Sequence, residues 1–308
     1  YLWDNGAGVA AISGLTATTY TVTVMDVNLC PVTGSTTLIQ PTPVSVTIVN
    51  TSVTCSGAAD GTATATGAGG EGGFTYVWSN TDVTATATGL SATTYTVTAT
   101  DANLCPVIET TTILEPAPIT VTVVNTSITC PGDNDGTATA TAGGGTGTLV
   151  YTWDNSVGPG AAVAGLTNIN YTVTVTDGNL CTQTGTTTIL APTPITLTAS
   201  ATPADCSGAS DGGISASASG GEGTLTYAWS NGGGNTATNN ALPAGTYIVT
   251  VTDGNLCTAT ATAIILEPTP VSVTIANTSV TCNAGNNGTA TATGSGGTSG
   301  YTYLWDNG

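Results

Sequence analysis

The sequence contains no lysine, no arginine and no histidine in 308 residues, against 18 aspartates and glutamates. Without histidine or lysine the chain cannot form a Ser-His or Cys-His nucleophile pair, a Schiff base or an imidazole metal site. Without cationic side chains it cannot clamp phosphate, and a net charge of −18 repels nucleic acid and anionic membranes. These absences predict that the protein is not an enzyme and has no nucleic-acid partner.

Long apolar runs are also missing. No stretch approaches the roughly 18 apolar residues of a membrane-spanning helix, and no signal peptide is recognisable. We therefore expect no membrane insertion within this sequence. The charged fraction is only 6%, so solubility must come from threonine hydroxyls, glycine and asparagine. Such a surface offers trypsin-like proteases no cleavage site, which suits a protein located outside the cell, on its surface.

What the sequence does contain is a regular repeat. The tryptophans recur every 75 or 76 residues, each two positions after a tyrosine, and YLWDNG occupies both residues 1–6 and residues 303–308. A fixed period of this size predicts stacked copies of one module, here a window of a longer array. The predicted modules are 1–41 (partial), 42–116, 117–192, 193–268 and 269–308 (partial). The two partial copies together amount to one further module.

Within each copy, threonine alternates with apolar residues over strand-length runs. In the copy 117–192 this pattern predicts strands at 119–124, 137–141, 149–153, 171–176 and 186–190, with a weaker strand leading to Leu166. No segment has the 3.6-residue periodicity of a helix. Six or seven short strands in a module of about 75 residues predict an all-β fold. The expected architecture is a linear array of tandem immunoglobulin-like antiparallel β-sandwiches.

The tryptophans are predicted to pack in the cores of these modules. Trp78, Trp153 and Trp229 lie in mid-strand, with a tyrosine on the same face. A tryptophan that stacks on a carbohydrate would need to be exposed. In the copy 117–192 the predicted core consists of Tyr151, Trp153, Leu166, Tyr171, Val173, Val175 and Ile189.

Eight cysteines recur at spacings that alternate between 25 and 50 or 51 residues. An even number in strict phase predicts disulfides in an oxidising compartment. One register joins Cys55 to Cys105, Cys130 to Cys181 and Cys206 to Cys257, each pair within one module. The other register joins cysteines 25 residues apart, such as Cys105 and Cys130, across the Pro-x-Pro segment. We favour the first, because Pro-x-Pro is typical of an extended connector.

The acidic residues give only a weak indication of a metal site. Asp133 and Asp135 resemble the start of a calcium loop, but other copies carry Ala58, Ala209 and Gly285 in place of Asp133, and no bidentate glutamate follows. We interpret both aspartates as turn formers and expect no cofactor, with calcium as the alternative. Aspartates that recur before Asn-Leu-Cys are interpreted in the same way: Asp26, Asp101, Asp177 and Asp253.

One set of motifs resembles a known family. The run C-x-G-x-x-D-G-T-A-T-A-T, a glycine-rich turn, Y-x-W-S-N, then Y-T-V-T-x-T-D-x-N-L-C and a closing E-P is similar to the SprB-type repeat of long surface adhesins in gliding Bacteroidota. In one copy the match covers Cys55–Asn80 and Tyr95–Pro116, while Asn287 replaces the loop aspartate in the last copy. The resemblance implies a secreted, surface-attached fibre exported by the type IX system, with no catalytic residues.

Three functions from different classes fit these patterns. The leading hypothesis is the shaft of a bacterial cell-surface filament or adhesin, in which semi-rigid modules hold a binding tip away from the cell. The second is a glycan- or surface-binding repeat, and the third is a cable of identical chains that associate laterally through threonine-rich faces. The expected partners are the neighbouring repeats, identical chains, and an extracellular surface or glycan bound through regions outside this window.

Overall fold

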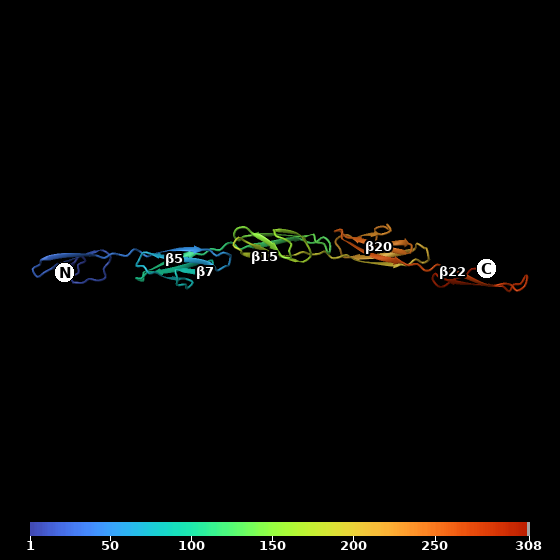
Figure 1. Cartoon of the computed structure of the whole chain (residues 1–308), viewed down its shortest axis with the longest axis horizontal. Coiled ribbons are helices and arrows are strands. Elements are labelled where there is room, and N and C mark those ends of the chain that lie inside the picture. The colour runs from blue at the N-terminus through green and yellow to red at the C-terminus, as the bar shows by residue number, and fades with distance from the viewer. Residues whose placement is uncertain (307–308) are drawn as a thin grey trace. The chain divides into compact units, whose positions relative to one another are not determined.

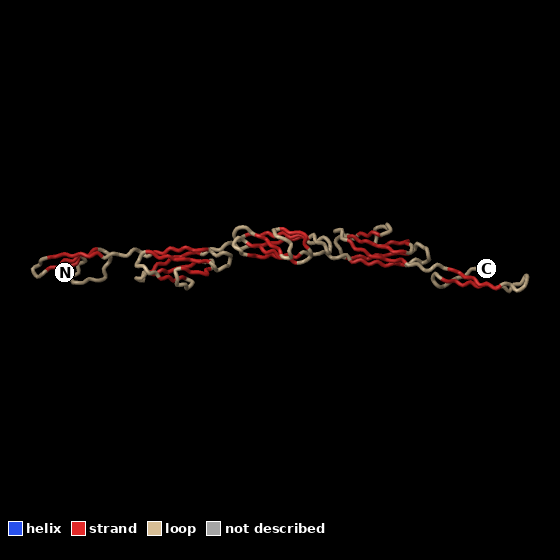
Figure 2. Tube along the Cα trace, in the orientation of Figure 1, coloured by secondary structure: helices blue, strands red, loops and turns tan. Residues whose placement is uncertain are grey.

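The structure is a computed structural model that describes residues 1–306. Every regular element among these residues is a β-strand (Figure 2). β-branched threonine, valine and isoleucine dominate the strands, because their side chains pack well on a pleated surface. The described part of the chain contains no helix long and apolar enough to cross a membrane.

The strands of residues 1–116 are β1 (Leu2–Trp3), β2 (Thr19–Met25), β3 (Pro31–Thr37), β4 (Ser45–Thr51), β5 (Gly61–Ala68), β6 (Thr75–Trp78), β7 (Thr86–Leu90), β8 (Thr94–Thr100) and β9 (Pro106–Thr112). Those of residues 117–192 are β10 (Thr120–Thr126), β11 (Gly136–Gly143), β12 (Val150–Trp153), β13 (Ala162–Leu166), β14 (Asn170–Thr176) and β15 (Thr182–Thr188). The remaining strands are β16 (Thr196–Thr202), β17 (Gly212–Ser219), β18 (Thr226–Trp229), β19 (Thr238–Leu242), β20 (Gly245–Thr252), β21 (Thr258–Ile265), β22 (Ser272–Thr278) and β23 (Thr289–Ser295).

Residues 42–116 form a sandwich of two antiparallel sheets, with the strand orders β4-β5-β7 and β6-β8-β9 (Figure 1). The first sheet contributes Ala63 and Ala65 to the core, and the second contributes Trp78 and Val97. Alternate residues of each strand point into this core, so the alternation in the sequence becomes a buried face and a solvated face. The predicted all-β, immunoglobulin-like fold is confirmed.

The other copies repeat these strand orders. Residues 117–192 contain the sheets β10-β11-β13 and β12-β14-β15, and residues 193–268 contain β16-β17-β19 and β18-β20-β21. Residues 1–41 contain only the sheet β1-β2-β3, and the described part of 269–308 contains only the sheet β22-β23. The first partial copy therefore holds one half of a sandwich and the second holds strands of the other half.

By compactness the chain divides into two units. One comprises Tyr1–Thr120, Ala142–Leu149 and Thr176–Gln183, and the other comprises the remaining described residues. Each predicted module boundary falls between strands. The boundaries themselves stay a prediction.

All six strands expected in residues 117–192 are present, with one shifted start. β15 begins at Thr182 rather than at residue 186, because the preceding turn closes at Cys181 and the chain pairs with β14 at once. β13, expected to be the weakest, is short but regular and ends at Leu166.

The predicted core is confirmed, with one residue only half-buried. Exposure is at most 4% for Trp153, Leu166, Tyr171, Val173, Val175 and Ile189, whereas Tyr151 is half-buried. Trp78 and Trp229 are buried as well. Each indole N–H donates to a backbone carbonyl 2.9–3.0 Å away, at Thr84, Gly160 and Thr236 respectively for Trp78, Trp153 and Trp229. Rings buried in this way cannot stack on a sugar.

A tyrosine at the start of the fifth strand of each complete copy fixes the corner of the sandwich. The hydroxyl of Tyr95 accepts a hydrogen bond from the backbone N–H of Ser91 at 3.2 Å. Tyr247 instead donates to the carbonyl of Pro243 at 3.0 Å, because proline has no N–H to offer. A tyrosine that bonds back to the preceding backbone is a hallmark of immunoglobulin-like sandwiches.

Candidate functional site

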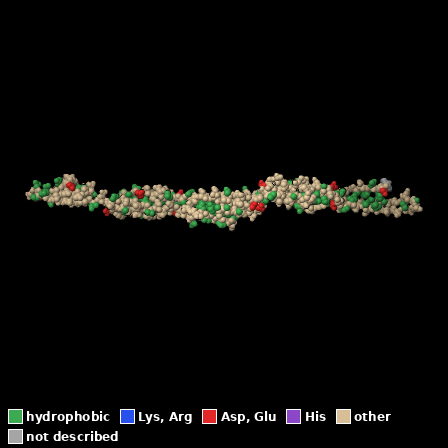
Figure 3. Space-filling model, turned by 90° about the horizontal axis from the view of Figure 1, so that it is seen from above, with side chains coloured by type: hydrophobic (Ala, Val, Ile, Leu, Met, Phe, Trp, Pro, Cys, Tyr) green, Lys and Arg blue, Asp and Glu red, His purple; other side chains and the backbone are tan. Residues whose placement is uncertain are grey.

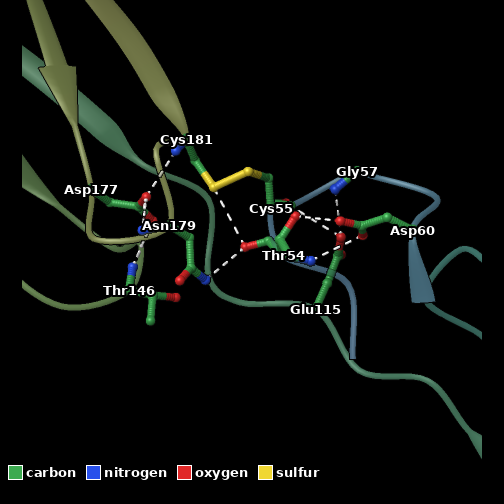
Figure 4. The surroundings of a disulfide bond; sticks show 10 residues. Thr54, Cys55, Gly57, Asp60, Glu115, Thr146, Asp177, Asn179 and Cys181 are labelled. Carbon is green, nitrogen blue, oxygen red and sulfur yellow. Dashed lines mark hydrogen bonds between the residues drawn. A yellow bond between two sulfur atoms is a disulfide. The ribbon is translucent and has the colours of Figure 1, made fainter. Parts of the chain in front are cut away.

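Two disulfides join cysteines of successive repeats. Cys55 bonds to Cys181 with a Cα–Cα distance of 5.7 Å (Figure 4). Cys130 bonds to Cys257 with a distance of 5.6 Å. The linked residues lie 126 and 127 positions apart, so each bond connects the loop after the first strand of one copy to a turn in the next copy. The distances are typical of a disulfide.

Both registers predicted from the sequence are wrong. Cys105 and Cys206, expected to pair within their modules, are free and exposed, as are Cys30 and Cys282. The 25-residue register fails because Cys130 is bonded to Cys257.

The intramodule register fails because the two cysteines of a copy lie at opposite ends of its sandwich. Cys55 follows the end of β4, whereas Cys105 lies in the β8–β9 turn, near the start of β4. That turn is fixed there because Asp101 accepts a hydrogen bond from the N–H of Glu71, just after β5. A seven-residue strand spans about 23 Å, which is far too long for a disulfide to bridge.

The Pro-x-Pro connector brings the two halves of each junction together. The N–H of Gly57, in the loop that carries Cys55, donates to Oε2 of Glu115 at 2.8 Å. The N–H of Gly145, in the glycine-rich turn of the next copy, donates to the carbonyl of Ala117 at 2.9 Å. Loop and turn are thus both tied to one connector.

Gly144, beside this contact, cannot be replaced by a residue with a side chain. An added Cβ would lie 2.0 Å from the carbonyl oxygen of Pro118, and the residue has a φ of +78°. Glycine is therefore required for both the close approach and the backbone conformation.

A buried carboxylate holds the turn that carries Cys181. Oδ1 of Asp177 accepts hydrogen bonds from the N–H groups of Asn179 and Cys181 at 2.9 Å, and Oδ2 accepts one from Thr146 at 2.8 Å (Figure 4). Burial acts most strongly on this group and raises its pKa, but the three donors together outweigh burial and lower the pKa below 3.8. The ionised carboxylate therefore anchors the turn at neutral pH.

The equivalent turns are built in the same way. Asp101 accepts from Asn103, Cys105 and Glu71, and Asp253 accepts from Asn255, Cys257 and Glu222. The N–H of Cys105 is the main reason why the pKa of Asp101 is lowered, and the N–H of Glu222 is the main reason for Asp253. The interpretation of these aspartates as turn formers is confirmed.

The leucine of the D-x-N-L-C motif adopts a left-handed backbone in each copy. Leu180 has a φ of 66° and Leu256 has a φ of 68°, and both side chains are about 80% exposed. This conformation costs a non-glycine residue roughly 1–2 kcal/mol. The aspartate hydrogen bonds stabilise the turn and point the following cysteine at the preceding copy.

The asparagine of this motif also reaches the preceding copy. Nδ2 of Asn179 donates to the carbonyl of Thr54 at 3.1 Å, and Nδ2 of Asn255 donates to the carbonyl of Thr129 at 3.4 Å. Sequence reasoning missed these contacts. The only signal was the recurrence of D-x-N-L-C, which does not reveal what the turn faces.

The calcium candidates form hydrogen bonds within their own loop. Asp135 accepts from the N–H of Thr129 at 2.9 Å and also from its hydroxyl, and Asp133 accepts from the N–H of Cys130 at 3.1 Å. Both shape the loop that presents the disulfide. No group of three or more potential metal-ligating side chains occurs among residues 1–306. Calcium at this loop stays a hypothesis.

The surface of the chain is mostly uncharged, since only 6% of its residues are charged. Figure 3 shows scattered carboxylates among neutral polar atoms. Because the chain has no cationic side chain, none of these carboxylates can form an ion pair with another side chain of the chain.

Together, the sandwiches and the junctions define a class of protein: a tandem array of immunoglobulin-like modules in which disulfides bridge successive repeats. The SprB repeat family matches this chain four times, at residues 47–83, 119–158, 198–234 and 274–308. The chain therefore contains SprB repeats, as the motifs predicted. No curated protein matches it.

Solved structures resemble the chain only distantly. The eight N-terminal immunoglobulin domains of Down Syndrome Cell Adhesion Molecule are 9% identical, with a TM-score of 0.30, over 90% of this chain and 55% of that one. A Ca²⁺-stabilized adhesin that helps an Antarctic bacterium bind ice is 21% identical, with a TM-score of 0.31, over 81% of each chain. Domains 1–6 of the surface layer protein SbsC are 14% identical, with a TM-score of 0.25, over 91% of this chain and 53% of that one. At these TM-scores, none of the likenesses bears on function.

Proposed function

We propose that this chain is a shaft region of a bacterial cell-surface adhesin or filament, located outside the cell, which holds a binding region away from the surface. The observation that carries the proposal is the pair of disulfides between successive repeats, Cys55–Cys181 and Cys130–Cys257. A covalent bond across each of these two junctions limits hinge motion where a tandem array is otherwise most flexible.

These two junctions have attachments besides the disulfide. Between the second and third modules Asn179 donates to Thr54, and the bond from Gly145 to Ala117 holds the glycine-rich turn of the third module on the connector. Between the third and fourth modules Asn255 donates to Thr129, and the N–H of Gly221 donates to the carbonyl of Thr193 at 3.1 Å in the same way. Proline further restricts the connector, so a semi-rigid junction is expected.

The two disulfides also interlace, since Cys130 lies inside the loop that Cys55 and Cys181 close. A pulling force applied to the ends of the chain therefore cannot extend these repeats fully while the disulfides are intact. Reducing both disulfides frees about 150 of the residues between Cys55 and Cys257, on the order of 500 Å of extended chain. Resistance to extension is a useful property for a shaft under load.

Small-angle X-ray scattering and single-molecule stretching test this function. The oxidised chain should scatter as an elongated particle, and the double variant Cys55→Ser/Cys181→Ser should scatter as a more flexible one and extend further under force. Cys282→Ser, which removes a free thiol, is the matched control and should leave both measurements of the monomer unchanged. A compact oxidised particle would contradict the proposed shaft function.

We also propose two kinds of partner for this shaft region. Lateral association of identical chains would use the threonine-rich faces, where the low charge density keeps repulsion weak. Contact with an extracellular surface or glycan would come from regions outside this window. Scattering that stays monomeric at high concentration and in high salt would argue against lateral cables.

A further inference from the structure

We propose that the two interlaced disulfides allow the shaft to survive a cut in its backbone. An extracellular endopeptidase that cleaves a peptide bond between residues 55 and 257 does not separate the two ends of the chain. This inference rests on the proposed shaft function, because a shaft under load fails at the first point where it is severed. Only the four bonded cysteines are needed for it: Cys55, Cys130, Cys181 and Cys257.

Two covalent routes lead from Cys55 to Cys257. The first crosses the disulfide to Cys181 and then follows the backbone from residue 181 to residue 257. The second follows the backbone from residue 55 to residue 130 and then crosses the disulfide to Cys257. Each route contains one disulfide and one Pro-x-Pro connector, 192–194 in the first and 116–118 in the second. A cut in either connector therefore leaves the other route intact.

The backbone from residue 130 to residue 181 belongs to neither route. It contains the strands β11 to β14, which carry the buried Trp153 and Val173. Its loop after β12 is exposed at Asn155 and Ser156, and exposed loop tips of small or polar residues are preferred sites of proteolysis. A cut in this loop opens neither route. The segment also joins the two routes, so the ends stay connected even when each route is cut once.

The two routes cross the module 117–192 on strands that are bonded to each other. The second route uses β10, which leads from the connector to Cys130, and the first route uses β15, which leads from Cys181 to the next connector. Nδ2 of Asn125 donates to the carbonyl of Thr188 at 3.1 Å, and the N–H of Ile128 donates to the carbonyl of Leu190 at 3.1 Å. Load lost from one strand can therefore pass to the other through these bonds.

The ends produced by a cut after Glu115 stay attached to their own modules. Glu115 accepts a hydrogen bond from Gly57 on one side of the cut, and Ala117 accepts one from Gly145 on the other. Hydrolysis consumes one water and leaves one carboxylate and one amine, and neither disulfide changes. The disulfide from Cys55 to Cys181 then spans the cut.

The chain carries natural sites for a glutamate-specific endopeptidase. Glu71 and Glu222 are exposed in glycine-rich turns, each is followed by glycine, and they lie in different routes. Glu109 lies in β9, while Glu115 and Glu267 precede proline, a position that such enzymes do not cleave. No glutamate lies between residues 130 and 181. Even complete cleavage at the first three sites should therefore leave the two ends joined.

The test digests the full 308-residue chain, tagged at both ends, with this endopeptidase under native conditions. Free thiols are alkylated first, so that the disulfides cannot exchange. Denaturing electrophoresis should show both tags in one band without reductant and in separate bands with reductant. Tags that separate without reductant overturn the proposal. A turn that resists this enzyme is given the site of a sequence-specific viral protease after Gly72 or Gly223, and the same outcomes decide.

A matched pair of variants tests the connectors themselves. Pro116→Gly and Pro268→Gly make equivalent connectors cleavable, after Glu115 and after Glu267 respectively. The first cut lies inside the disulfide from Cys55 to Cys181, so the tags should stay together, whereas the second lies outside both disulfides, so they should separate. Separated tags in Pro116→Gly overturn the proposal. Joined tags in Pro268→Gly also overturn it, because something other than the two disulfides would then hold the fragments.

Removing one disulfide at a time should expose one route at a time. The variant Cys55→Ser/Cys181→Ser should release the fragment 1–71 without reductant, because only that disulfide spans the cut after Glu71. The variant Cys130→Ser/Cys257→Ser should instead release the fragment 223–308. Mass spectrometry identifies the fragments, and release of the same fragment from both variants would overturn the assignment of one disulfide to each route.

Single-molecule stretching measures whether the cut chain still bears load. A digested chain held at both ends should stay tethered until reductant is added, and loss of the tether before that point overturns the proposal. Failure of this property is distinguishable from failure of the shaft function. Separated tags in a chain that scatters as an elongated particle contradict only the tolerance of cuts, whereas a compact particle whose tags stay joined contradicts only the shaft.

Discussion

The complete module 42–116 and the partial module 269–306 share most of their sequence pattern but differ in what they bury. Strand β5 carries Ala63 and Ala65 fully inside, packed against a second sheet, whereas the equivalent strand β23 has only β22 beside it. Both segments form the same hairpin in the same register. The alternating pattern is therefore sufficient for strand pairing, and burial depends on the facing sheet. The following predictions test this difference.

The largest effect is expected from the disulfides. The double variant Cys55→Ser/Cys181→Ser opens a loop of 126 residues and should lower the free energy of unfolding by about 4–5 kcal/mol, mainly because the unfolded chain gains entropy. The free Cys282 in the partial module gives the matched control, and Cys282→Ser should leave the unfolding of the dilute monomer unchanged. Denaturant unfolding under non-reducing conditions measures the free energy of unfolding of both variants. An equal loss of stability in the two would contradict the assigned pairing.

The tryptophans should show nearly as large a contrast. Trp78 is 2% exposed and Trp305 is 39% exposed. Trp78→Ala removes a packed indole and its hydrogen bond, so we expect a loss of about 3–5 kcal/mol. Trp305→Ala should cost well under about 1 kcal/mol in the dilute monomer. Urea unfolding, followed by the fluorescence of the remaining tryptophans, gives the measurement. A large loss at Trp305 would mean that the partial module is already packed.

A glycine pair isolates the effect of close packing. A Cβ added at Gly61 would lie 2.8 Å from Cγ2 of Ile113 and 2.9 Å from the carbonyl of Leu90, whereas one added at Gly288 comes no closer than 3.2 Å to any atom. Gly61→Ala should therefore destabilise its module by about 1–3 kcal/mol. Gly288→Ala should be neutral or stabilise by about 0.4–1 kcal/mol, since alanine restricts the unfolded chain. Thermal unfolding of the two variants measures this difference. Similar shifts in melting temperature would argue against the facing sheet as the cause of the destabilisation at Gly61.

Acid should weaken the junction turns. The pKa of Asp177 is lowered in the folded state, so its stabilising contribution is present above the ordinary value of 3.8 and is lost as pH falls through the lower, folded-state pKa. The melting temperature should therefore drop below about pH 4, and Asp177→Asn should flatten that drop. Asp26 accepts two backbone hydrogen bonds of the turn, whereas Asp177 accepts three, so Asp26→Asn should flatten it less. Melting curves from pH 7 to pH 2 test the order.

Removal of divalent metal should have the smallest effect. Asp133 and Asp135 already accept hydrogen bonds from their own loop, so excess chelator should leave the melting temperature unchanged. The variant Asp135→Ala should still be destabilised, because Thr129 loses its acceptor. A calcium-dependent rise in melting temperature that disappears in this variant would revive the calcium hypothesis.

Much of the fold was predictable because it depends on local pattern. The period of the tryptophans predicted the modules, and alternation such as Tyr171-Thr-Val-Thr-Val-Thr predicted the strands and the buried residues Val173 and Val175. The aspartate before Asn-Leu-Cys predicted a turn, since a short carboxylate reaches the N–H groups that follow it. These features need only neighbours in the sequence or a face of a strand.

The disulfide pairing depended on the tertiary structure alone. Spacing along the chain placed Cys55 and Cys105 in one module, but it could not tell at which end of the sandwich each loop lies. The whole length of β4 separates Cys55 from Cys105. The thiol that lies beside Cys55 is that of Cys181, which the connector positions from the next copy. The sequence thus determined the module and its repetition, because strand pairing and burial follow from alternation. Only the three-dimensional path of the connector decided how one module is bonded to the next.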